Sequence, residues 1–138
     1  MYEIVKKTFL SSNIVLMDIK APRTAKHCYP GQFVIVKTDE KGERIPLTIC
    51  DYNREEGTVT IVFQTVGAST KMMADYEVGD YFRDFVGPLG CKSDLIDESV
   101  EELKAKKMLF IAGGVGTAPV YPQVKWLHEQ GIDVDVII

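Results

Sequence analysis

Residues 43–50 carry side chains suited to an anionic, planar ligand. The stretch reads Glu-Arg-Ile-Pro-Leu-Thr-Ile-Cys. In an extended strand, successive side chains point to opposite faces, so Arg44, Pro46 and Thr48 share one face and the aliphatic residues Ile45, Leu47 and Ile49 share the other. Arg44 offers a planar fork of donors for a diphosphate, and Thr48 places a hydroxyl roughly 13 Å further along the strand. The aliphatic face is expected to join the core, and the other face to bind a ligand.

Pro46 restricts where this strand lies in a sheet. Proline has no N–H to donate to a neighbouring strand, so Pro46 is expected at a sheet edge or barrel opening. A planar ligand such as a flavin can lie against such a strand, and its diphosphate would span the interval to Arg44. Taken alone, Arg44 is equally consistent with an exposed strand arginine that binds nothing.

A second phosphate-binding candidate follows at residues 66–70. Gly67 leads into a predicted helix over 69–76, and Ser69 and Thr70 place two hydroxyls at the helix start. Backbone N–H groups and the positive end of the helix dipole suit a phosphate at such a junction. The alternative for both hydroxyls is plain helix capping.

A third candidate is the glycine turn after an apolar stretch at 107–112. Gly113 to Gly116 leads into a segment with helical periodicity over 117–130, a geometry that suits a pyrophosphate. Pro119 stands where the usual GxGxxG dinucleotide fingerprint has its third glycine, and proline is compatible with the first turn of a helix. The alternative is a tight strand-to-helix turn without a ligand.

The elements that position these residues fall into two groups. Six short strands are expected over 2–9, 13–20, 32–38, 45–50, 58–64 and 80–86, with glycine-containing turns between most of them. This pattern predicts an all-β, six-stranded antiparallel Greek-key barrel over residues 1–95. Residues 96–138 read as a helix over 97–106, a strand, the glycine turn, a helix and an apolar strand over 134–138. They predict the start of an α/β nucleotide-binding domain, incomplete because a parallel sheet needs more than two strands.

Composition and charge exclude several functional classes. The net charge of -4 comes from interspersed acids and bases, without a basic cluster that would bind nucleic acid. The N-terminus lacks the apolar core of a secretion signal, and no apolar run approaches ~20 residues, so a cytoplasmic protein without membrane contact is expected. Cys28, Cys50 and Cys91 are too widely separated to form a disulfide framework or a metal site and are expected to be reduced thiols.

Taken together, these motifs resemble those of the ferredoxin-NADP reductase superfamily. Arg44-x-Pro46-Leu47-Thr48-Ile49 is similar to its flavin signature, and Gly67-x-x-Thr70 to its second phosphate-contacting turn. Barrel landmarks at Pro22, 30–34 and 84–90 are also similar, as is the glycine turn that ends at Pro119. The resemblance implies that FAD is held by Arg44, Pro46, Leu47, Thr48, Ile49, Gln64, Val66, Gly67, Ser69 and Thr70. It also implies that NAD(P)H is bound by Gly113, Gly114, Gly116, Thr117, Ala118 and Pro119.

Within the superfamily, the chain looks closest to the alpha subunit of NADH-dependent ferredoxin:NADP oxidoreductase, also known as sulfide dehydrogenase. The electron-transfer subunit of dihydroorotate dehydrogenase is the nearest rival. Either resemblance implies hydride transfer between NAD(P)H and N5 of FAD, followed by passage of single electrons to ferredoxin or another iron–sulfur partner. It implies that Thr48 tunes the reactivity of N5 by hydrogen bonding and that no side chain acts as a catalytic group. Both families pair with a larger subunit and carry a [2Fe–2S] cluster, which is expected only in the full-length protein. An alternative of another class is a flavin-free β-barrel that serves protein contacts only.

Overall fold

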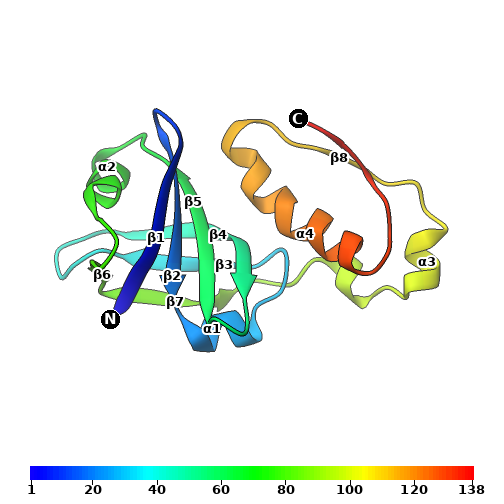
Figure 1. Cartoon of the computed structure of the whole chain (residues 1–138), viewed down its shortest axis with the longest axis horizontal. Helices are drawn as coiled ribbons and strands as arrows, with labels where there is room; N and C mark the ends of the chain where they lie inside the picture. Colours follow the sequence, from blue (N-terminus) through cyan, green and yellow to red (C-terminus); the bar gives the residue numbers. More distant parts are fainter.

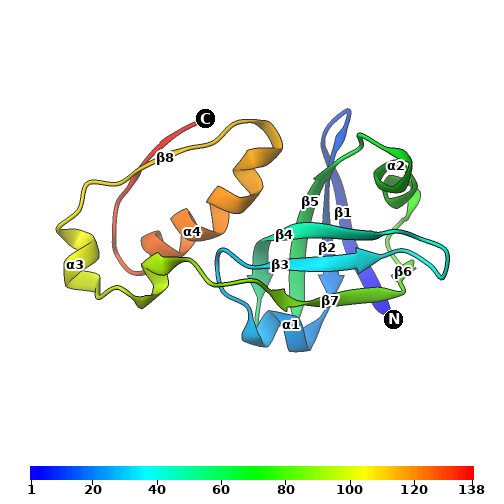
Figure 2. The same cartoon turned by 180° about the vertical axis from the view of Figure 1, so that it is seen from behind.

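The computed structural model describes all 138 residues, from Met1 to Ile138. A β-barrel occupies the N-terminal part of the chain, and a smaller α/β segment follows it (Figure 1). Seen from behind, the two parts lie side by side, with helix α4 of the α/β segment next to the barrel (Figure 2). None of the helices combines the length and the apolar character needed to cross a bilayer.

The barrel is one antiparallel sheet in the order β6-β1-β2-β5-β4-β3-β7. Its strands are β1 (Tyr2–Ser11), β2 (Ile14–Lys20), β3 (Phe33–Lys37), β4 (Arg44–Asn53), β5 (Thr58–Gln64), β6 (Tyr81–Phe82) and β7 (Asp84–Leu89). The predicted antiparallel barrel is confirmed, and the last expected strand is divided in two at Arg83. Its first part pairs with β1 and its second with β3, so this stretch reaches both ends of the strand order and nearly closes the barrel.

The barrel interior is filled by the alternate side chains of the strands. On β2, for example, Val15, Met17 and Ile19 are buried, while the residues between them are more exposed. The period-two pattern therefore sends one face of each strand inward. Sixteen buried residues form one continuous core. They come from every barrel strand and from two short helices.

These helices are α1 (Pro22–His27) and α2 (Ala68–Asp75). The sequence predicted α2 but no helix at α1, which is only six residues long. Arg54 supports the end of α1, because its guanidinium donates to the carbonyls of Ala25 and Cys28 at 2.9 Å each. These carbonyls have no partner within the helix, so a side chain distant in sequence completes a helix too short to be recognised by periodicity.

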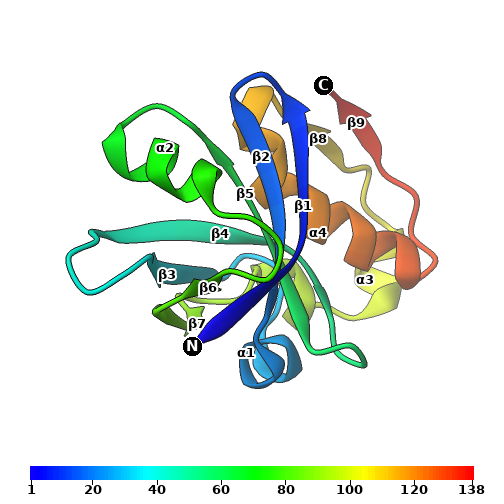
Figure 3. The same ribbon diagram turned by 60° about the vertical axis from the view of Figure 1, so that its left-hand side comes forward.

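The α/β segment contains 3-10 helix η1 (Asp94–Asp97), helix α3 (Val100–Lys104), strand β8 (Leu109–Ile111), 3-10 helix η2 (Gly114–Gly116), helix α4 (Thr117–Glu129) and strand β9 (Asp135–Ile137). β8 and β9 pair in parallel, so the predicted strand, turn, helix and strand are present. Only Leu103, Leu127 and Ile132 form its buried core, which is separate from the core of the barrel. Helix α4 packs against β4 of the barrel, on the side of the sheet that faces the α/β segment (Figure 3).

Candidate functional site

Strand β4 has one unpaired edge along its first half. β3 pairs with it from Arg44 to Thr48, whereas β5 pairs with it only from Ile49 onward. Pro46 therefore lies on a stretch that has a neighbouring strand on one side only, as the sequence predicted for a residue without an N–H. This arrangement leaves the strand open to a ligand.

The side chains of this stretch alternate as expected. Arg44 and Pro46 are exposed, whereas Leu47 is half-buried and packs against the core. Ile49, predicted to lie beside the flavin ring, has its side chain fully buried in the barrel core. The same alternation that exposes Pro46 turns Ile49 inward, so its side chain is not available to a ligand.

The two segments predicted to bind a diphosphate lie next to each other. The Ser69 hydroxyl, at the start of α2, donates a hydrogen bond to the carboxylate of Glu43, which directly precedes β4. The neighbouring Arg44 guanidinium is only loosely held, at 3.5 Å from Asp84, and its side chain is 58% exposed. Arg44 is thus free to reach an anion near α2.

The start of α2 is capped by one of the two predicted hydroxyls. Thr70 Oγ1 accepts hydrogen bonds from the backbone N–H groups of Val66 at 3.0 Å and Gly67 at 3.1 Å. The capping interpretation therefore holds for Thr70. In front of Gly67, a Cβ atom would meet nothing within 4 Å, so the space there is open to a ligand.

The glycine turn before α4 is also open. A Cβ atom built on Gly113, Gly114 or Gly116 would meet nothing within 4 Å. Gly114 has a φ of +55°, a left-handed conformation that disfavours other residues, whereas Gly116 has an ordinary φ of -63°. Pro119 lies in the first turn of α4, as the sequence predicted.

One cleft joins the open edge of β4 to the glycine turn. It has a volume of about 420 Å³ and is lined by Pro46, Leu47, Thr48, Val62, Phe63, Gln64, Val66, Thr70, Val115, Gly116, Ala118 and Pro119. Residues predicted for FAD and residues predicted for NAD(P)H therefore share a single cavity. The sequence missed Val62, Phe63 and Val115. Alternation along β5 places Val62 on the outer face, and Val115 lies inside the glycine turn. Phe63 belongs to the buried core, so alternation does not point to it.

The other predicted residues lie around this cleft or beside it. Arg44, Gly67, Ser69 and Gly113 do not line it. Gly114 and Thr117 line an adjacent cleft of about 490 Å³, whose walls also include Cys50, Asp51 and Tyr121. Val62, Val115 and Ala118 line both cavities, so the two clefts adjoin.

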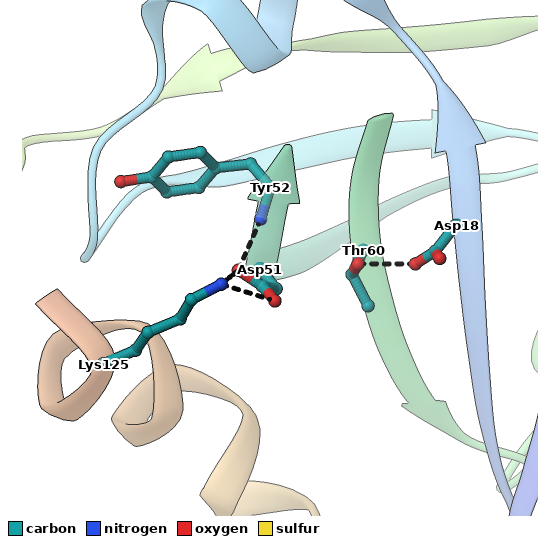
Figure 4. Close-up of polar contacts among 5 residues, drawn as sticks. All are labelled: Asp18, Asp51, Tyr52, Thr60 and Lys125. Atoms are coloured by element: carbon teal, nitrogen blue, oxygen red, sulfur yellow. Dashed lines mark hydrogen bonds and ion pairs between the residues drawn. The ribbon is translucent and has the colours of Figure 1, made fainter. Parts of the chain in front are cut away.

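Asp18, Asp51 and Thr60, which line the adjacent cleft, take part in polar contacts on the outer face of the barrel (Figure 4). Asp51 on β4 accepts two hydrogen bonds from Lys125 Nζ on α4, at 2.8 and 3.1 Å. The hydrogen bond to Asp51 raises the pKa of Lys125. On the neighbouring strands, Thr60 Oγ1 donates to Asp18 at 2.5 Å. On this face, Asp51 forms an ion pair with Lys125, whereas Asp18 accepts a hydrogen bond from a neutral hydroxyl.

Two of the three cysteines have buried, weakly acidic thiols. Burial raises the pKa of the Cys28 and Cys50 thiols to about 11, with the nearby Asp51 carboxylate adding to the effect at Cys50. Both thiols are protonated at neutral pH, so neither offers the thiolate that a nucleophile or metal ligand requires. Cys91 is exposed.

No family model matches the chain. Individual proteins do. The chain is 65% identical over all of its 138 residues to the Clostridium beijerinckii "uncharacterized protein in adh 3' region", of which it covers 47%. It is 38% identical over 136 residues, or 99% of its length, to the dihydroorotate dehydrogenase B (NAD(+)) electron transfer subunit homolog of Thermotoga maritima, of which it covers 46%.

The fold is similar to that of a solved NADH-dependent reduced ferredoxin-NADP oxidoreductase. The TM-score is 0.88 at 37% sequence identity, over 99% of this chain and 47% of the other. The resemblance to the ferredoxin-NADP reductase superfamily is thereby confirmed. The chain spans about half the length of the curated relatives that it matches. Within this superfamily, similarity extends both to ferredoxin-NADP oxidoreductase and to the dihydroorotate dehydrogenase electron-transfer subunit.

Proposed function

We propose that the chain is the flavin-binding front part of an oxidoreductase electron-transfer subunit, which passes electrons between NAD(P)H and an iron–sulfur acceptor through FAD. The observation that carries this proposal is the single cleft formed by the open edge of β4 and the glycine turn before α4. Two motifs far apart in the sequence, each suited to one half of the reaction, face the same cavity. We also propose the division into a flavin domain (1–95) and a nucleotide domain (96–138).

The residues present fit FAD. The cleft wall is largely apolar and adjoins a strand without a partner on one edge, which suits a planar ring. Pro46, Leu47 and Thr48 would lie against the ring, with the Thr48 hydroxyl near its reactive edge. Gln64 and Val66 would form the opposite wall. Bound FAD would supply the electron-carrying chemistry, accepting electrons in pairs from NAD(P)H and releasing them singly.

The diphosphate would lie between Arg44 and the start of α2. Arg44 would contribute charge and paired donors, and the backbone at Gly67, Ser69 and Thr70 would contribute N–H groups and the positive helix end. Glu43 accepts a hydrogen bond from Ser69 in this structure, so that carboxylate must move aside when an anion binds. The open space at Gly67 supports this placement.

The glycine turn would admit the nicotinamide half of NAD(P)H. Gly113, Gly114 and Gly116 leave the backbone uncovered, and Thr117, Ala118 and Pro119 form the start of α4 behind them. Close approach of the two rings needs only positioning, so no side chain of the site has to act as a nucleophile or general acid. The protein orients the partners and excludes water.

We propose a larger flavoprotein or iron–sulfur subunit as the partner, ferredoxin as the acceptor, and a [2Fe–2S] cluster in the full-length protein. The 37% identity to the ferredoxin-NADP oxidoreductase structure supports a subunit of this kind of enzyme. The 38% identity to the Thermotoga maritima subunit homolog favours a second candidate, the electron-transfer subunit of a dihydroorotate dehydrogenase. Co-purification with the full-length protein separates them, because one predicts a glutamate-synthase-like subunit and the other a dihydroorotate dehydrogenase.

Titration of the purified chain with FAD tests the proposal. The single tryptophan, Trp126 on α4, gives a fluorescence signal that bound FAD should quench, and the melting temperature should rise. FMN, which lacks the diphosphate, is the matched control ligand and should bind more weakly. If FAD causes neither quenching nor a thermal shift, the proposal fails and the flavin-free interaction module becomes the better account.

A further inference from the structure

The barrel and the α/β segment meet mainly through helix α4, which packs against β4. Their buried cores are separate, so no shared apolar interior fixes one against the other. Gln123 on α4 accepts a hydrogen bond from Ser93, but Ser93 lies in the connection between the two parts. The bond from Lys125 to Asp51 is the hydrogen-bonded link between α4 and a barrel strand (Figure 4).

Both ends of this link belong to elements of the proposed site. Asp51 lies three residues beyond Thr48 on β4, or roughly 10 Å along the strand. Lys125 lies eight residues beyond Thr117 on α4, or roughly 12 Å along the helix. The strand that would face the flavin and the helix that begins at the glycine turn are thus tied at their far ends.

A bulge in β4 is what aims Asp51 at α4. Ile49 pairs with Ile61 and Asp51 pairs with Thr60, so Cys50 is an extra residue in the ladder. Strict alternation would place Asp51 on the inward face together with the buried Ile49. The extra residue turns Asp51 outward, which is a common use of bulges beside functional sites.

The link lies at the edge of a packed contact. A small crevice next to it is lined by Asp51, Tyr52, Pro122, Lys125, Trp126 and Glu129. The Lys125 side chain is 38% exposed and that of Asp51 is 29% exposed, so water screens the pair only in part. Both carboxylate oxygens accept from Nζ, and Asp51 Oδ1 also accepts from the N–H of Tyr52 at 2.8 Å. The backbone contact fixes the carboxylate, so the pair has a defined direction.

We propose that Lys125 and Asp51 are positioning residues for electron transfer, which hold the glycine turn at its working distance from the flavin strand. This inference rests on the proposed function. It predicts a division of effects: loss of the pair slows reduction of the flavin by the nicotinamide nucleotide but leaves flavin binding intact, because neither residue lies among those proposed to hold FAD.

The test uses full-length protein loaded with FAD. Lys125→Met keeps the length of the side chain and removes its charge. Lys106→Met is the matched control, because it breaks the ion pair with Glu98 inside the α/β segment and away from the barrel. We expect Lys125→Met to lower the rate of flavin reduction at saturating NADH or NADPH by roughly tenfold, since small displacements of reacting groups have large kinetic effects. FAD affinity and reduction by dithionite should match the control.

Two further variants decide whether the charge pair is responsible. Lys125→Arg should reduce at close to the wild-type rate, and the exchanged pair Lys125→Asp with Asp51→Lys should recover much of the loss. The inference is overturned if Lys125→Met reduces as fast as Lys106→Met, or if its FAD affinity falls in the same proportion as its rate. Wild-type protein that binds no FAD, or whose bound FAD is not reduced, overturns the proposed function itself.

Discussion

The barrel and the α/β segment differ in how much of their structure they stabilise alone. The buried core cluster of the barrel contains sixteen residues, whereas that of the α/β segment contains three. On β8, Ile111 is 71% exposed, and on β9, Ile137 is 54% exposed. Fold stability therefore resides mainly in the barrel, and the α/β segment depends on its contact with β4 for its place. The proposed site lies where the stable part meets the dependent part.

Matched core truncations should separate the two parts most strongly. Ile61→Ala, in the barrel core, should lower the free energy of unfolding by about 2–5 kcal/mol. Leu127→Ala, in the α/β core, should act near the lower end of that range because its exposed surroundings can relax. In urea titrations, Ile61→Ala should shift the circular dichroism transition, and Leu127→Ala mainly the Trp126 fluorescence transition. Equal shifts of both signals in both variants would show a single cooperative unit instead.

Removal of the Arg44 charge should weaken FAD binding without unfolding the barrel. Charge-assisted hydrogen bonds contribute about 1.5–3 kcal/mol, so Arg44→Met should lower FAD affinity by roughly 10- to 100-fold. Arg83→Met is the control, since Arg83 is a similarly exposed arginine that pairs with Glu40. Fluorescence titration measures both. Identical affinities in the two variants would remove Arg44 from the proposed diphosphate site.

Two alanine substitutions in the glycine turn distinguish folding from binding. Gly114→Ala should destabilise the α/β segment by about 1–2 kcal/mol, because alanine resists the φ of +55°. Gly116→Ala should fold normally, since its φ is ordinary and its Cβ meets no protein atom. That Cβ would occupy space proposed for the nucleotide, so the KM for NAD(P)H should rise in Gly116→Ala. An unchanged KM there would contradict the proposed nucleotide site.

The smallest expected effect is on alkaline stability. The pKa of Cys28 is raised to about 11 from 9.0, so its protonated form is favoured in the folded state. This contribution is complete below pH 9 and is lost as the pH rises toward 11, by about 1.4 kcal/mol per pH unit at most. Cys28→Ala should flatten the decline in denaturation curves over this range, whereas the exposed Cys91→Ser should not. A steep decline retained in Cys28→Ala would assign it to other groups.

Local patterns in the sequence were sufficient to predict most strands of the barrel. Alternation predicted β5 as residues 58–64, the bounds that the structure shows. Helix α1 was missed because six residues give little periodicity and its end is supported by the distant Arg54. The division of the last strand at Arg83 depends on which neighbours it meets, and no local pattern encodes that choice.

For the candidate site, the sequence identified motifs but not their spatial relation. It placed Arg44 and Thr48 near or on a strand and the glycine turn before a helix, as in the structure. Only the fold shows that Thr48 and Gly116 line one cleft. For Ile49, alternation indicated the inward face, and the structure buries its side chain there. Asp51 and Lys125 had no sequence signal, because the bulge at Cys50 and the docking of α4 arise from tertiary structure.

Hydrogen–deuterium exchange with and without FAD and NAD(P)H tests the central claim most directly, namely that one cleft serves both motifs. Amides in ligand-covered segments exchange more slowly. FAD should slow exchange at residues 44–48 and 64–70, and NAD(P)H added to the FAD complex should extend the effect to residues 113–119. Protection confined to one of these motifs, or found instead around α1 and β7, would contradict the account.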